Sequence, residues 1–168
     1  MLQQQQAENP HKDIVGIIEV GGKIAAVSRD GYILYGDADG FVAKKAQGVS
    51  YFTGALAMWE KGADKLLLLG IQGGTNSTAH GYREILLAAD GNLDMATLSL
   101  RRPGEEAPSS VEPSSEKDNR YVVTIGKHPL SSIIQVSDKI LFAATTQYGL
   151  WSYKYREHEG MSVWNAED

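Results

Sequence analysis

Two distant stretches of the chain decide the fold: GIIEVGGKI at residues 16–24 and SIIQVSDKI at residues 132–140. They align without a gap, so that isoleucine, isoleucine, valine, lysine and isoleucine fall at matching places. Each stretch is a short apolar run, a turn dipeptide and the start of a second apolar run, a pattern typical of a β-hairpin. A hairpin that returns with the same residues indicates a repeat fold.

Further strands follow each hairpin. Short apolar runs separated by Gly, Asp and Asn predict a four-stranded meander after the tail, with strands at residues 14–20, 23–28, 32–35 and 41–44. The same order near the C-terminus predicts strands beginning at residue 132 and at residues 141–145, 150–155 and 161–166. Both ends of the chain are therefore expected to form antiparallel sheets of four strands.

The middle of the chain is a longer version of the same unit. It predicts strands at residues 53–60, 65–72, 83–88 and 94–100, with the extra length in a Gly, Ser, Thr and Asn loop at residues 73–81. The main alternative is a helix within residues 54–70, because Ala, Leu, Met and Trp residues there tolerate helical structure. Gly62 and the order of the repeat argue against that helix.

The fold class that follows is all-β: three four-stranded antiparallel meander blades, forming a partial, open β-propeller or half of a six-to-eight-bladed ring. The blades are expected at about residues 13–50, 51–100 and 121–168. Residues 1–12 are expected to be a flexible tail, and residues 101–120, rich in Pro, Ser and Glu, a disordered loop. The innermost strands, at residues 16–18 and 132–134, are expected to be covered on both faces.

The stretch KILFAATTQYGLWSY at residues 139–153 resembles the blade core of propeller repeats of the two-component-regulator type. In that family an apolar strand ending in Thr precedes a short polar turn, Gly-Leu and an aromatic strand. The first unit keeps the apolar strand with Ser28 and Gly31, and the middle unit keeps residues 65–70. The resemblance implies a β-propeller that binds a ligand or partner, with no single activity, often in bacterial extracytoplasmic or membrane-attached proteins.

The number of blades raises the question of what completes the structure. Closed propellers have about four to eight blades, so three would leave an open arc with two apolar faces exposed. Three explanations remain open. The chain is the C-terminal part of a larger propeller, which we favour, or two copies join into a six-bladed ring, or something else caps the arc.

Composition excludes several classes of function. The 168 residues carry a net charge of −5 without a basic stripe, so nucleic acid is not expected as a partner. There is no cysteine, which removes disulfides and cysteine-ligated zinc. No apolar run approaches the roughly 20 residues of a membrane span. The N-terminus lacks the features of a signal peptide. The chain as written is therefore expected in the cytoplasm, or outside it as a piece of a longer exported protein.

Four residues are candidates for binding a ligand or partner. His80 lies in the long loop, and His128 precedes Pro129 at the entry to an inner strand. Tyr82 and Tyr148 lie at strand edges, where a ligand could reach them. Trp151 and Trp164 are expected to pack between blades instead.

Neither catalysis nor metal binding is predicted at these positions. The histidines lack the spacing of metal ligands, and the chain has no Gly-x-Ser-x-Gly nucleophile motif. We therefore assign no catalytic residue, no metal and no cofactor. The favoured function is a non-catalytic module that binds a protein or small ligand on its loop face. The alternative is a hydrolase or lyase with a site on the axial face, and a third possibility is an arc that serves only as structure.

Overall fold

The computed structural model describes residues 13–73, 80–103 and 125–167. The predicted tail at residues 1–12 and nearly all of the predicted loop at 101–120 lie outside these residues. The described chain is all-β and forms three antiparallel sheets that do not close into a ring. No helix in the described part has the length and apolar character to cross a membrane.

The three sheets follow one another along the chain. The first is β1 (Ile14–Val20), β2 (Lys23–Ser28), β3 (Tyr32–Asp37) and β4 (Gly40–Lys45). The second is β5 (Tyr51–Lys61), β6 (Asp64–Gln72) and β7 (Gly81–Leu86). A short 3-10 turn, η2 (Ile125–Lys127), leads to the third: β8 (Leu130–Ser137), β9 (Ile140–Thr145), β10 (Leu150–Arg156) and β11 (Met161–Ala166). Neighbouring strands pair in sequence order, as the meander pattern predicts.

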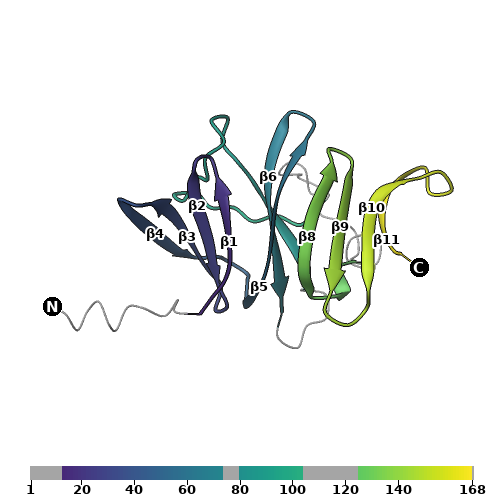
Figure 1. Cartoon of the computed structure of the whole chain (residues 1–168), viewed down its shortest axis with the longest axis horizontal. Coiled ribbons are helices and arrows are strands. Elements are labelled where there is room, and N and C mark those ends of the chain that lie inside the picture. The colour runs from purple at the N-terminus through teal and green to yellow at the C-terminus, as the bar shows by residue number, and fades with distance from the viewer. Residues whose placement is uncertain (1–12, 74–79, 104–124, 168) are drawn as a thin grey trace.

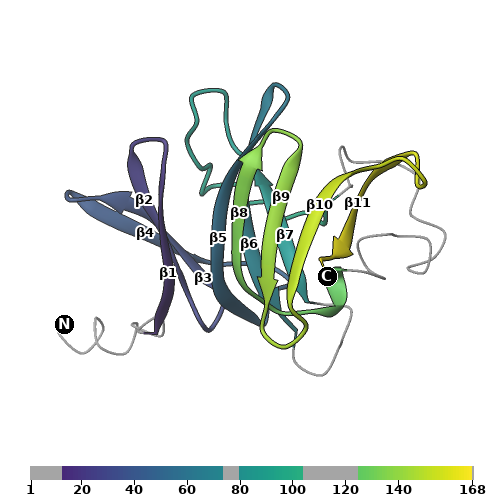
Figure 2. The ribbon, with the colours of Figure 1, turned by 45° about the vertical axis from the view of Figure 1, so that its right-hand side comes forward.

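The first strands of the three sheets lie next to one another. β5 contacts β1 on one side and β8 on the other. From this central row the sheets spread apart, with β4 at the left of the molecule and β11 at the right (Figure 1). The same fan of sheets is visible after a 45° turn (Figure 2). The middle sheet therefore stands between the other two.

Two apolar layers fill the spaces between the sheets. The middle strand β6 supplies both, because alternate residues of its leucine run point to opposite faces. Leu67 and Leu69 pack with Val27 and Ile33 of the first sheet. Leu66 and Leu68 belong to the second layer, with Leu130, Leu141 and Trp164 of the third sheet. Burial on both faces explains the continuous apolar run of β6.

The inner strands of the outer sheets are covered on one face only. Ile17 in β1 and Ile134 in β8 are largely exposed, whereas their neighbours Ile18 and Ile133 contact the middle sheet. The prediction that residues 16–18 and 132–134 are covered on both faces is therefore wrong. The physical reason is that, in the part of the chain that the structure describes, each outer sheet has a neighbouring sheet on one side.

The fourth strand predicted at residues 94–100 is also wrong. Asp94 begins a turn in which its carboxylate accepts hydrogen bonds from the amide of Ala96 and the hydroxyl of Thr97. Leu98 is buried in the first apolar layer. Within residues 94–103, Arg101 pairs with β7, through an antiparallel bridge to Glu84. The Asp side chain stabilises a turn where the apolar pattern alone suggested a strand.

The alternative of a helix within residues 54–70 is excluded by β5 and β6. β5 has an irregular register between Phe52 and Leu56. Gly54 lies in this irregularity with φ of +102°, and the backbones of β1 and β5 come close there. A Cβ on Gly16 would lie 2.7 Å from the Gly54 carbonyl oxygen. Glycine in both strands therefore permits the close approach of the central row.

The two repeated hairpins differ by one residue. In the first sheet Glu19 pairs with Ile24, whereas in the third sheet Gln135 pairs with Leu141. A register shift between Gln135 and Ser137 takes up the extra residue. The gap-free alignment thus holds for β1 and β8 but is wrong by one residue from the second strand of each hairpin onward.

Candidate functional site

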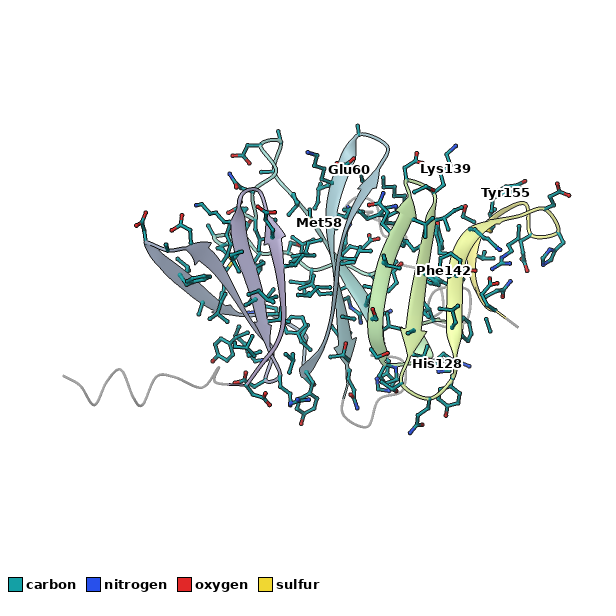
Figure 3. All side chains as sticks on the ribbon, viewed as in Figure 1. Met58, Glu60, His128, Lys139, Phe142 and Tyr155 are labelled. Carbon is teal, nitrogen blue, oxygen red and sulfur yellow. The ribbon has the colours of Figure 1, made fainter. Side chains whose placement is uncertain are left out.

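The candidate site lies at one end of the second and third sheets, where three connections meet. The amide of Gly81 donates to the carbonyl of His128 at 3.0 Å, and the amide of His80 donates to the carbonyl of Gly126 at 3.2 Å. The amide of Thr146 donates to the carbonyl of Pro129 at 3.1 Å. These bonds tie the segment before β7, the segment before β8 and the β9–β10 turn together. Figure 3 shows His128 at the end of the molecule opposite Glu60 and Lys139.

A threonine at the end of β9 shapes the turn that carries Tyr148. The Thr145 hydroxyl oxygen accepts a hydrogen bond from the amide of Tyr148 and donates one to the carbonyl of Gly149, both at 2.8 Å. Gly149 adopts φ of +80°, which glycine reaches without strain. The Thr, turn and Gly-Leu pattern of the sequence therefore has a local physical role, which is to hold Tyr148 at the tip of a fixed turn.

Three rings gather at this turn. The His128 ring centroid lies 4.6 Å from that of Tyr148 and 5.1 Å from that of Trp151. The Trp151 indole nitrogen donates to the carbonyl of Tyr148 at 3.1 Å, which fixes the indole against the turn. Tyr148 is 58% exposed, so the cluster presents a ring to solvent. We call His128, Tyr148 and Trp151 the ring cluster.

His80 lies beside the ring cluster. Its Nδ1 accepts a hydrogen bond from the amide of Gly73 at 3.3 Å. An accepting Nδ1 places the proton of the neutral ring on Nε2. His80 is close enough to His128 for the two charges to interact. The structure thus brings together three of the four predicted residues: His80, His128 and Tyr148.

Both histidines favour the neutral form. Burial lowers the pKa of His80. Burial also lowers the pKa of His128, and the positive charges of Lys127 and His80 act in the same direction. The Nδ1 atom of His128 is buried without a hydrogen-bond partner in the described part of the chain. A buried imidazole nitrogen without a partner is a position at which a bound group could donate or accept a hydrogen bond.

We expect the ring proton signals of His128 to titrate in NMR with a midpoint below the usual value near 6.5. The neutral ring is favoured in the folded state, so its contribution to stability is complete above the pKa of the unfolded chain. That contribution is lost as the pH falls from the pKa of the unfolded chain through the lower pKa of the folded protein. The measurement compares the midpoint in folded protein with that in urea. A folded midpoint equal to or above the unfolded one would contradict the burial of His128.

The prediction that Tyr82 is accessible to a ligand is wrong. Its side chain is fully buried in the second apolar layer, where its hydroxyl accepts a hydrogen bond from the Trp164 indole nitrogen at 3.2 Å. The strand β7 begins at Gly81, so Tyr82 is within the sheet and faces the third sheet. Its polar atom is satisfied inside the core, as is usual for a buried tyrosine.

The sequence reasoning missed Trp151 as a member of the site. Trp151 was expected only to pack between sheets, and it does lie against the second apolar layer. Its other contacts are with His128 and Tyr148. The signal available in the sequence was the spacing of Tyr148 and Trp151 across a Gly-Leu turn.

No group of three or more His, Asp or Glu side chains suited to a metal ion occurs in the described ranges. Comparison of the chain with protein families, with curated proteins and with solved structures finds no match.

Proposed function

We propose that the chain is a binding module built as an arc of three propeller blades. Three features support the blade interpretation: meander sheets in sequence order, first strands side by side in a central row, and apolar layers between successive sheets. Each sheet would then be one blade, with its first strand nearest the propeller axis. The third blade of this arc carries most of the ring cluster.

The proposed binding surface is the ring cluster, at the strand ends where His128 lies. The observation that carries the proposal is the exposed ring of Tyr148, which packs against the His128 ring. A tyrosine held by its turn and backed by His128 binds with little loss of side-chain entropy. A flat ring with a hydroxyl suits a partner that offers an apolar face and a polar edge, such as a sugar ring or an aromatic side chain. The function is thus recognition without catalysis.

The test is a binding screen with a matched control. A glycan array and a peptide library are probed with the wild type, with Tyr148→Ala and with Tyr155→Ala. Tyr155 is as exposed as Tyr148 and lies on β10, but it is not part of the ring cluster. We expect ligands of the wild type to bind Tyr148→Ala at least tenfold more weakly and Tyr155→Ala unchanged. Equal binding by wild type and Tyr148→Ala would refute the proposed surface.

A hydrolase or lyase is the second candidate, and the pKa values of two histidines favour it. His80 and His128 are both held toward the neutral form, which a general base requires near pH 7. The test is turnover of a panel of glycans and esters. Turnover by the wild type that is lost in His80→Ala or His128→Ala would replace the binding proposal with this one.

A further inference from the structure

Each outer sheet has one face that no other sheet covers among residues 13–73, 80–103 and 125–167. Registered pairs place the side chains of each such face on the same side of its sheet. On the first sheet we call this surface the leading face, made by Ile17, Ile24, Leu34 and Phe41. On the third sheet we call it the trailing face, made by Ile134, Phe142 and Leu150. These residues are apolar, although Glu19 pairs with Ile24 on the first face and Ser152 with Phe142 on the second. Exposed apolar patches mark interaction sites in soluble proteins.

The repeat supplies an internal comparison for the leading face. Ile17 pairs with Ala26 in the first sheet, and its counterpart Ile133 pairs with Ala143 in the third. Ile133 faces the sheet before it and is 5% exposed, whereas Ile17 has no sheet before it and is 70% exposed. Met58, at the same place in the second sheet, also packs against the sheet before it. The leading face therefore carries an apolar residue at a position that packs against a preceding sheet in the other two sheets.

The trailing face gives the converse comparison. Ile18 packs against the second sheet, whereas its counterpart Ile134 is 60% exposed. Ile33 is fully buried against the second sheet, and its counterpart Leu150 is 47% exposed. Ile33 pairs with Val27 and Leu150 with Ala144, which places them at the same position. The trailing face thus has the residues that meet a following sheet.

The two free faces are complementary in kind, because one lacks a preceding sheet and the other lacks a following sheet. We propose that a second copy of this chain covers both, with the trailing face of each copy packed on the leading face of the other. Two copies related by a twofold axis then form a closed ring of six sheets, within the usual range of propellers. The contacts between the copies then repeat the packing of the first sheet on the second and of the second sheet on the third. This inference rests on the proposed blade arrangement but not on the binding site.

The first experiment measures mass. Sedimentation velocity of the wild type is expected to give twice the 18.3 kDa of the chain. Ile17→Lys and Ile134→Lys place charges on the leading and trailing faces and are each expected to weaken the dimer at least tenfold. Both residues are exposed in the single chain, so the charges do not disturb its core. The matched control is Val42→Lys, because Val42 is equally exposed on β4 but lies on neither free face.

The second experiment tests the orientation of the copies. The chain has no cysteine, so introduced cysteines give unambiguous cross-links. Chains carrying both Ile17→Cys and Ile134→Cys are expected to form covalent dimers with a short bis-maleimide. Either single variant is expected to stay uncrosslinked, because like faces do not meet in a head-to-tail ring. Cross-linking of the single Ile17→Cys chain would overturn the arrangement.

Other outcomes are equally decisive. A wild-type monomer at high concentration would show that a second copy does not cover these faces, and a species larger than two copies would show an open assembly. Either result overturns the two-copy ring. Tyr148→Ala is expected to keep the dimer, so loss of ligand binding with the dimer retained separates this proposal from the binding proposal.

Discussion

Replacing Trp164 by alanine is expected to lower the free energy of unfolding by about 3–5 kcal/mol. The indole is buried in the apolar layer between the second and third sheets, and its nitrogen donates to the Tyr82 hydroxyl. It also contacts the rings of Tyr82 and Tyr153 at centroid distances of 5.8 and 5.7 Å. Alanine removes the ring and leaves the Tyr82 hydroxyl without this donor inside the core. Urea denaturation followed by circular dichroism measures the loss.

Two further variants separate packing from the hydrogen bond. Trp164→Phe keeps an aromatic ring but removes the donor, so we expect a smaller loss than for alanine. Tyr155→Ala, at an exposed position on the same sheet, is expected to change stability by less than about 0.5 kcal/mol. If Trp164→Ala were as mild as Tyr155→Ala, the second and third sheets would not pack through this layer.

Gly54→Ala is expected to destabilise the protein through two effects. The residue adopts φ of +102°, a conformation that costs other residues about 1–3 kcal/mol. An added Cβ would also collide with the carbonyl oxygen of Val15, so β1 and β5 would have to move apart. Because these strands form the central row, the displacement would also loosen the first apolar layer. The free energy of unfolding from urea denaturation is again the measurement.

Gly22→Ala is the matched control for this effect. Gly22 also has positive φ, +80°, but an added Cβ there meets nothing within 4 Å. Its cost reports backbone strain alone, and the excess for Gly54→Ala reports the close approach of the two strands. Equal costs for the two variants would contradict that approach.

Local chemistry made most strands predictable. In the first sheet the Gly-Gly dipeptide before Lys23 and the Asp-Gly dipeptides divide the chain into strands where the structure has them. The same reasoning failed at residues 94–100, because Asp94 closes a turn with its own side chain and Leu98 is buried without joining a sheet. At residues 94–100 the pattern of apolar side chains indicates burial and does not indicate a strand.

The candidate site was partly predictable, because one part of it depends on local sequence and the other on how the sheets pack. The Thr145 turn is local, so the sequence was enough to place Tyr148 at an accessible tip. His80 and His128 come from separate connections, and their meeting depends on how β7 and β8 lie together. Tyr82 is buried because the third sheet packs over it, which no local pattern reveals.

The two hairpins that define the repeat show this division most clearly. The sequence by itself determined the strands and turns of residues 16–24 and 132–140 and the matching apolar positions of their first strands, β1 and β8. Only the tertiary structure decided that Ile133 is buried and Ile17 exposed. Ile133 faces the second sheet, whereas Ile17 lies on the face of the first sheet that points away from it. Strand formation is a local property of the chain, whereas the covering of a sheet face depends on what lies beside it.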